Sequence, residues 1–178
     1  MKRISWLFMV VFLFGCGPAF HHSTHEQVTI LVEQNEITKI GNKLFICTDN
    51  RDWSCVKDVF APKVLFDMTS LSGGEPVKMT PEQITNTWEQ GLKGLKEIHH
   101  QAGNYQVTVK EKEADLFCYG IAFHYLPNLT NQNTRTFVGS YNMHMILTEI
   151  GWKIDKFKFN LKFIDGNKNL ESSSKTGS

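Results

Sequence analysis

The chain has 178 residues, a formal net charge of +1 and 41% hydrophobic residues. That length and composition suit one globular domain with a core of ordinary size. The near-neutral charge argues against a nucleic-acid-binding protein, which usually carries a surplus of basic residues on one face. The absence of a repeat with a period of about 20–50 residues argues against a solenoid.

The N-terminal segment has the features of an export signal. Lys2 and Arg3 precede an apolar run over residues 4–14, which is too short to span a bilayer core of about 30 Å. The run ends in LFGC, which resembles a bacterial lipobox and implies that Cys16 is diacylated and anchors the chain to a membrane. An ordinary cleaved signal with no role for Cys16 is the alternative. Gly17 is not the aspartate that retains many lipoproteins in the inner membrane, so we expect the outer membrane, on its periplasmic side.

Three helices are predicted before the main run of strands. Apolar residues recur at steps of three and four over residues 28–48, which is typical of a helix. A shorter helix follows over residues 53–60. A third helix spans residues 80–95, where Thr80 suits the N-cap and Pro81 the first turn.

The strands predict the class of fold. A first strand covers residues 63–68, and a loop is expected over residues 71–79. Aromatic and β-branched residues then predict four long strands, at residues 97–109, 114–126, 135–149 and 152–164. We therefore expect an α+β protein with a curved antiparallel sheet and helices on one face. The chain divides into a signal peptide (residues 1–15), a tether (16–27), the domain (28–165) and a disordered tail (166–178).

Two histidines face each other in the predicted hairpin of residues 97–126. Residues that oppose each other in an antiparallel pair have numbers with a constant sum, so a turn centred on Lys112 places His100 opposite His124. Their neighbours on that face, Ala102 and Ala122, are small, as a cavity requires. His99 then faces outward.

Hydrophobicity alone predicts the opposite arrangement. The other face of the hairpin holds the bulky residues Tyr105, Val107, Phe117, Tyr119, Ile121 and Phe123. If that face were the core, His100 and His124 would be exposed to solvent. A β-bulge near Gly103 would reconcile the two arrangements, because it shifts the alternation of side chains along one strand.

The cysteines leave one question open. Cys47 and Cys55 flank the segment CTDNRDWSC, and an exported protein can form disulfides. Spacing alone does not show whether their Cα atoms come close enough for a bridge. Cys118 would then be left over.

The order of motifs over residues 28–164 resembles the SnoaL-like branch of the nuclear-transport-factor-2-like superfamily, and within it the scytalone dehydratases. The resemblance implies a cone-shaped barrel made of a strongly curved antiparallel sheet, covered on its concave face by three N-terminal helices. The motifs that carry it are TDNRDW with Asp49, APKVLFDM, HHQAGN with His100, AFHY with His124 and YNMH with Asn142.

The resemblance implies that Asp49, His100 and His124 are catalytic and that Asn142 lines the same pocket. His144 shares the strand parity of Asn142 and either faces the pocket or lies on the surface. Two pocket tyrosines of the dehydratases fall on Thr48 and Met68 in this chain, so these two residues are expected to contact substrate. Because the tyrosines are absent, the identity of the substrate does not carry over.

An aspartate and two histidines suit proton transfer beside a carbonyl group. Asp49 would orient His100 as a base, and His124 would hold a second proton or stabilise an enolate-like oxygen. We expect a dehydratase-like lyase or isomerase that acts on a small carbonyl-containing or apolar ligand, without cofactor or metal. Asp49 could instead be a helix cap. The alternative function is a non-catalytic, lipid-anchored module for ligand binding or dimerisation. In either case, aromatic residues on both faces of the sheet predict a homodimer.

Overall fold

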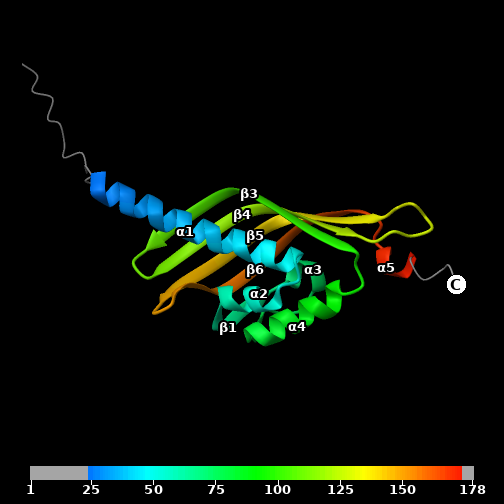
Figure 1. Ribbon diagram of the computed structural model, residues 1–178, viewed down its shortest axis with the longest axis horizontal. Helices are drawn as coiled ribbons and strands as arrows, with labels where there is room; N and C mark the ends of the chain where they lie inside the picture. Colours follow the sequence, from blue (N-terminus) through cyan, green and yellow to red (C-terminus); the bar gives the residue numbers. More distant parts are fainter. Residues whose placement is uncertain (1–23, 174–178) are drawn as a thin grey trace, which may run out of the picture.

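The computed structural model describes residues 24–173. The expected signal peptide and Cys16 lie outside this range. In chain order the elements are α1 (Thr24–Asp49), α2 (Trp53–Val59), β1 (Phe60–Asp67), α3 (Thr69–Ser72), β2 (Val77–Met79), α4 (Pro81–Leu92), β3 (Glu97–Lys110), β4 (Glu113–Tyr125), β5 (Thr134–Thr148), β6 (Gly151–Gly166) and α5 (Leu170–Ser173). The helices α1, α2 and α4 pack on one side of a long sheet (Figure 1).

The sheet confirms the α+β class and adds details that the sequence pattern does not reveal. Its strand order is β2-β1-β6-β5-β4-β3, and it is curved without closing into a barrel (Figure 1). The expectation of a wholly antiparallel sheet is wrong at one place, because β1 pairs with β6 in parallel. The segment expected to be a loop over residues 71–79 contains the end of α3 and the short strand β2.

Local sequence signals explain where the helices begin. Thr80 accepts a hydrogen bond from the backbone N–H of Gln83, whose side chain accepts one in return, and Pro81 occupies the first turn of α4. Asp52 caps α2 by accepting a hydrogen bond from the backbone of Cys55. Helix α1 begins at Thr24, four residues before the expected start, so the end of the expected tether is helical.

The hairpin of β3 and β4 contains the β-bulge that reconciles the two predicted faces. Its register changes between Gly103 and Gln106, where β3 has one residue more than β4, and Asn104 adopts a left-handed conformation with φ 56°. Beyond the bulge, Tyr105 and Val107 pack against the core, whereas before it His100 lies on the core-facing side.

The exact pairing of the two histidines differs from the prediction. His124 lies opposite Ile98, and His100 lies opposite Ala122, so the predicted register is wrong by two residues. Because side chains alternate with a period of two, this slip leaves both histidines on the same face of the sheet.

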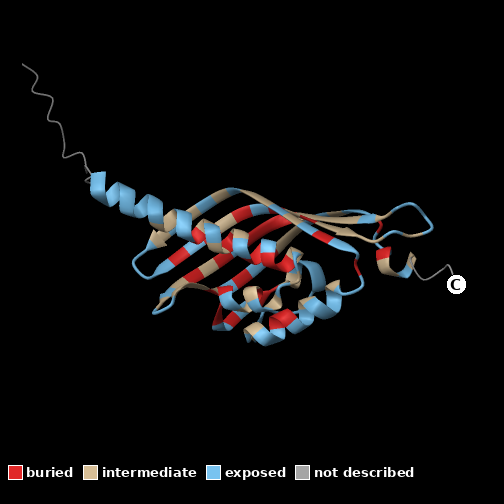
Figure 2. Ribbon diagram, viewed as in Figure 1, coloured by how far each residue is buried: buried red, intermediate tan, exposed pale blue. Residues whose placement is uncertain are grey.

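The core lies between the sheet and the three main helices. Figure 2 shows buried residues on the C-terminal half of α1, on α2 and α4, and along the middle of the long strands. Fully buried members include Ile37, Leu44, Val56 and Ile84 from the helices and Leu116, Met143 and Ile154 from the sheet. The first turns of α1 are exposed and extend past the sheet (Figures 1 and 2).

Residues 166–173 include the end of β6 and the short helix α5, contrary to the disordered tail expected from residue 166 onward. Leu170 is completely buried against a small cluster with Leu95 and Ile98. Asn167 donates from its backbone to Thr134. These contacts fasten α5 to the end of the sheet that carries the start of β5.

A disulfide joins Cys47 and Cys55, whose Cα atoms lie 5.8 Å apart. It connects the last turn of α1 to α2 and so encloses Asp49. Cys118 is a free, buried thiol. Within residues 24–173, no helix is long and apolar enough to cross a membrane.

Candidate functional site

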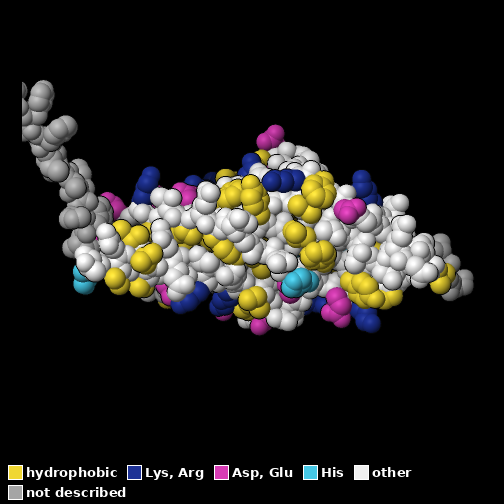
Figure 3. Space-filling model, turned by 90° about the horizontal axis from the view of Figure 1, so that it is seen from above, with side chains coloured by type: hydrophobic (Ala, Val, Ile, Leu, Met, Phe, Trp, Pro, Cys, Tyr) yellow, Lys and Arg dark blue, Asp and Glu magenta, His cyan; other side chains and the backbone are white. Residues whose placement is uncertain are grey.

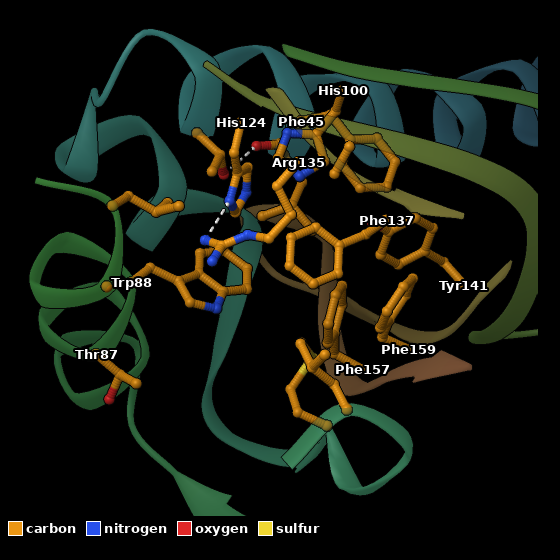
Figure 4. A pocket seen from close by; sticks show the side chains of 17 residues that line it. Phe45, Thr87, Trp88, His100, His124, Arg135, Phe137, Tyr141, Phe157 and Phe159 are labelled. Carbon is orange, nitrogen blue, oxygen red and sulfur yellow. Dashed lines mark hydrogen bonds between the residues drawn. The ribbon is translucent and has the colours of Figure 1, made fainter. Parts of the chain in front are cut away.

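A cavity of about 290 Å³ lies between the helices and the concave face of the sheet. Its wall includes six aromatic side chains, from Phe45 and Trp88 on the helices and from Phe137, Tyr141, Phe157 and Phe159 on the strands. Figure 4 shows these rings around His100, His124 and Arg135. The site is therefore a largely apolar cavity with a few polar groups in its wall.

Asp49 orients His100. One oxygen of Asp49 lies 2.6 Å from Nδ1 of His100, and the other accepts the backbone N–H of the same residue at 2.8 Å. Both side chains are about one-seventh exposed, at 14% for His100 and 16% for Asp49. Since a carboxylate accepts hydrogen bonds, Nδ1 carries the proton, and Nε2 of a neutral His100 is left with a lone pair. Asp52, rather than Asp49, caps α2.

His99 lies on the other side of β3. Its side chain is 67% exposed, and its ring stacks on Phe123, with a centroid distance of 6.2 Å. It is also 3.8 Å from Asp49, beyond hydrogen-bonding distance. His100, not His99, therefore lines the cavity, as the hairpin pattern predicts.

His124 is held by Arg135. The two residues face each other across β4 and β5, and Nη2 of Arg135 lies 3.2 Å from Nδ1 of His124 (Figure 4). Because a guanidinium only donates, Nδ1 is the acceptor, and the proton of a neutral His124 resides on Nε2. Burial, with smaller contributions from Arg135 and His100, lowers the pKa of His124 to about 4. At neutral pH this ring is therefore uncharged.

The two histidines thus present opposite functions to the cavity. His100 has its proton on Nδ1 and offers a basic Nε2, whereas His124 offers an N–H donor at Nε2. One ring can remove a proton while the other donates a hydrogen bond to an oxygen that gains charge.

Of the other expected residues, two line the cavity and one does not. Thr48 and Met68 contribute to the wall, and the Thr48 hydroxyl donates to the backbone oxygen of Leu44 at 2.8 Å. Asn142 is exposed on the opposite face, where it accepts a hydrogen bond from Asn160 at 2.8 Å. The expectation that Asn142 lines the pocket is wrong, because its neighbour Tyr141 faces inward and consecutive strand residues alternate.

His144 also lies on the outer face. Its Nδ1 is 2.6 Å from Asp155, so it forms a second histidine–aspartate pair away from the cavity. Within residues 24–173, no group of three or more His, Cys, Asp and Glu side chains is placed to hold a metal ion.

The sequence motifs assign no role to Arg135, Tyr141 or Glu171. Tyr141 lies over Gly120, where a Cβ atom would come within 2.2 Å of its ring, and burial raises the pKa of its hydroxyl. A tyrosine thus reaches the cavity from β5, although Thr48 and Met68 replace the expected ones. Arg135 and Tyr141 lie two and four residues from Phe137 on β5, so the alternation of side chains could have placed them on the same face as Phe137. No sequence pattern marks Glu171.

A curved sheet that encloses a cavity beneath N-terminal helices is the fold of the nuclear-transport-factor-2-like class of proteins. A family model described as "SnoaL-like domain" matches residues 29–158, and the chain belongs to this family.

Solved structures show the same fold at low sequence identity. The Kfla4162 protein from Kribbella flavida has a TM-score of 0.75 and 18% identity, over 80% of this chain and 98% of that one. A candidate scytalone dehydratase from Novosphingobium aromaticivorans has a TM-score of 0.66 and 15% identity, over 79% and 91%. A hexachlorocyclohexane dehydrochlorinase, LinA-type3 from Novosphingobium barchaimii, has a TM-score of 0.64 and 12% identity, over 80% and 94%. No protein of curated function matches the chain.

Proposed function

We propose that this protein is a cofactor-independent lyase or isomerase that moves a proton beside the carbonyl group of a small ligand. The observation that carries the proposal is the pair of histidines with opposite proton arrangements in one apolar cavity. Membership of the SnoaL-like family and the fold shared with a candidate scytalone dehydratase and a dehydrochlorinase support it.

In the proposed reaction, Nε2 of His100 takes a proton from the carbon next to the carbonyl. The electron pair of that C–H bond moves toward the carbonyl oxygen, which receives the N–H of His124 as it becomes an enolate. Asp49 stabilises the resulting imidazolium of His100. The proton then passes to a leaving hydroxyl, which departs as water, or to another carbon, which gives an isomer. Each such proton transfer typically contributes about 10²–10⁴-fold in rate.

The wall of the cavity suggests the kind of ligand. Aromatic rings from helices and strands surround a volume of about 290 Å³, which suits a compact, largely apolar compound with one or two rings. Tyr141, on β5, also contributes to this wall.

The proposal is tested by exchange of ligand protons with solvent deuterium. A panel of cyclic and aromatic β-hydroxy ketones is incubated with the protein in D₂O, and NMR follows deuterium incorporation and loss of water. We expect His100→Gln and Asp49→Asn to lose at least 100-fold of the activity. His144→Gln is the matched control, because His144 has the same 2.6 Å contact with an aspartate on the outer face.

Binding without exchange would favour the alternative, a non-catalytic binding module. The apolar lining supports that second candidate, since an apolar cavity can bind a ligand without catalysing a reaction. Equal activity of His100→Gln and His144→Gln would contradict the proposed enzyme.

We also propose that the chain is anchored to the outer membrane through a diacylated Cys16, facing the periplasm. Two acyl chains give stable attachment where one is marginal. The first turns of α1, which follow the tether, expose Val28, Leu31 and Val32, and Figure 3 shows hydrophobic side chains at that end of the molecule. Cys16→Ser should release the protein from the membrane or leave it unprocessed; unchanged processing and retention would contradict the anchor.

A further proposal is a homodimer formed through the outer face of the sheet. Tyr119 and Phe163 are 45% and 54% exposed there. Exposed aromatic residues on a sheet commonly mark an interface between subunits.

A further inference from the structure

Arg135 connects the candidate site to the C-terminal segment. Its guanidinium forms two hydrogen bonds to the carboxylate of Glu171, at 2.8 and 2.5 Å, and a third contact to His124 at 3.2 Å. The carbon of the guanidinium lies 5.2 Å from the centroid of the Phe137 ring. Both terminal nitrogens of this side chain therefore have a named partner.

Glu171 is held in turn by the anchoring of α5. Leu170, its neighbour, is completely buried. The side chain of Asn167 donates to Gln132 at 3.0 Å and to Ser173 at 3.2 Å. Gly166 has φ 76°, and a Cβ atom there would come within 2.4 Å of the backbone oxygen of Thr134. The path from the end of β6 to Glu171 is thus well defined.

Stability alone is a poor explanation for Arg135. Its side chain is only 15% exposed, and its Nε is buried with no hydrogen-bond partner within residues 24–173. An unpaired buried donor costs about 1–3 kcal/mol. The ion pair with Glu171 is also weak evidence for stabilisation, because the Glu171 side chain is 41% exposed and solvent screens its charge.

We propose that Arg135 is a positioning residue that keeps the proton of His124 on Nε2, and that Glu171 holds Arg135 for this role, so that the C-terminal segment completes the active site. The use of this tautomer in catalysis rests on the proposed function. If Nε2 of His124 carries the proton, the ligand must present a hydrogen-bond acceptor, such as a carbonyl oxygen, to His124. Without Arg135, either nitrogen of the ring could carry the proton, and the donor would be lost in a fraction of molecules.

The charged and titratable groups that face His124 come from four elements: Arg135 on β5, His100 on β3, Asp49 on α1 and Glu171 on α5. Arg135 and His100 lower the pKa of His124, whereas Glu171 and Asp49 raise it. Substitutions of Arg135 and Glu171 should therefore move this pKa in opposite directions.

The experiment measures the proton on His124 directly, in the full chain in mild detergent without ligand. NMR of ¹⁵N-labelled histidine distinguishes the protonated from the unprotonated ring nitrogen. The variants are Arg135→Met, Arg135→Lys and Glu171→Gln. Glu36→Gln is the control, because Glu36 pairs with Lys39 on the exposed surface of α1 at 2.7 Å.

We expect a single Nε2–H form in the unaltered protein and in Glu36→Gln. Arg135→Met should give a mixture of tautomers and raise the pKa of His124, whereas Arg135→Lys should retain most of the Nε2–H form because lysine is also a charged donor. Glu171→Gln should lower the pKa and give a smaller share of the second tautomer. If Arg135→Met does not fold, the Glu171→Gln variant still decides the outcome.

Unchanged signals of His124 in Arg135→Met would overturn the proposal. So would a retained single tautomer in Glu171→Gln combined with an unchanged pKa of His124. Since this measurement needs no turnover, it separates the positioning role from the proposed reaction. A protein without proton-exchange activity but with these shifts would refute only the proposed function.

Discussion

Burial sets the charge state of individual side chains in and around the site. His124 and Tyr141 both lie in the cavity wall, and for both the loss of hydration disfavours the charged form. The pKa of His124 falls and that of Tyr141 rises, so both are neutral at neutral pH. Cys118, buried behind the wall, has its pKa raised to about 12 for the same reason. These residues can donate hydrogen bonds but carry no charge.

The low pKa of His124 predicts a specific loss of stability in acid. Between pH 6.5 and about 4 the unfolded chain binds a proton at this residue that the folded protein does not bind. The free energy of unfolding should therefore fall as the pH drops through this range, by as much as about 3 kcal/mol from this group. Urea unfolding at several pH values measures it. The slope against pH should be smaller in His124→Gln, and parallel slopes would contradict the prediction.

At the scale of elements, one extra residue in β3 decides which residues face the cavity. The bulge at Asn104 lets His100 and Ala102 face inward before it and Tyr105 and Val107 pack against the core after it. The left-handed conformation of Asn104 is tolerated by asparagine and glycine but strained in β-branched residues.

This conformation gives a prediction for two substitutions of one exposed residue. Asn104→Val should lower the free energy of unfolding by about 1–2 kcal/mol, because valine in a left-handed conformation places its Cβ against the backbone. Asn104→Gly should change it by no more than about 0.5 kcal/mol. Chemical denaturation of both variants provides the measurement. An equal effect of valine and glycine would show that the bulge moves elsewhere.

The disulfide between Cys47 and Cys55 holds α1 and α2 together on either side of Asp49. Its sequence separation of 8 residues predicts a contribution of roughly 2–3 kcal/mol through the entropy of the unfolded chain. The double variant Cys47→Ala/Cys55→Ala should be destabilised by that amount. A reductant should lower the stability of the unaltered protein but not that of the double variant; the same response in both would contradict the assignment.

At the scale of the whole molecule, the two faces of the sheet have different roles. Phe157 and Phe159 line the cavity, whereas Phe163 is exposed on the outer face. All three residues have odd numbers, so a regular strand would place them on one face. A bulge opposite Val138 and Gly139 adds a residue to β6 between Phe159 and Phe163 and turns Phe163 outward. Only part of the aromatic surface expected on the outer face is therefore present.

The remaining outer aromatic residues predict where a dimer would form. Tyr119 packs against Phe117 with a centroid distance of 5.3 Å, and Lys162 lies 4.1 Å from the Tyr119 ring. Sedimentation equilibrium at micromolar concentration should show a dimer that Phe163→Glu dissociates. Leu147→Glu is the control. Leu147 is 41% exposed and lies near the end of β5, whereas Phe163 pairs with Val138 near the start of that strand. A monomer before substitution, or equal dissociation by both variants, would contradict the predicted interface.

The sequence by itself determined the elements and the family. Apolar periodicity, the cap at Thr80 and the long aromatic strands predict the helices and the main sheet, because these signals act between residues close in the chain. The motif order identified the SnoaL-like family, and Asp49, His100 and His124 lie where the cavity forms or at its edge. The predicted register differed from the observed one by two residues. Because side chains alternate with a period of two, His100 and His124 still share a face.

Only the tertiary structure decided what surrounds those residues. The pairing of β1 with β6, the outward position of Asn142 and the contact of Arg135 with Glu171 depend on segments far apart in the chain. A β-bulge adds a single residue and leaves little trace in composition, yet it exchanges the two faces of a strand. The C-terminal segment is polar and resembles a disordered tail. It packs on the domain because Leu170 is buried in a small apolar cluster and Glu171 pairs with the partly buried Arg135, and no local pattern encodes these contacts.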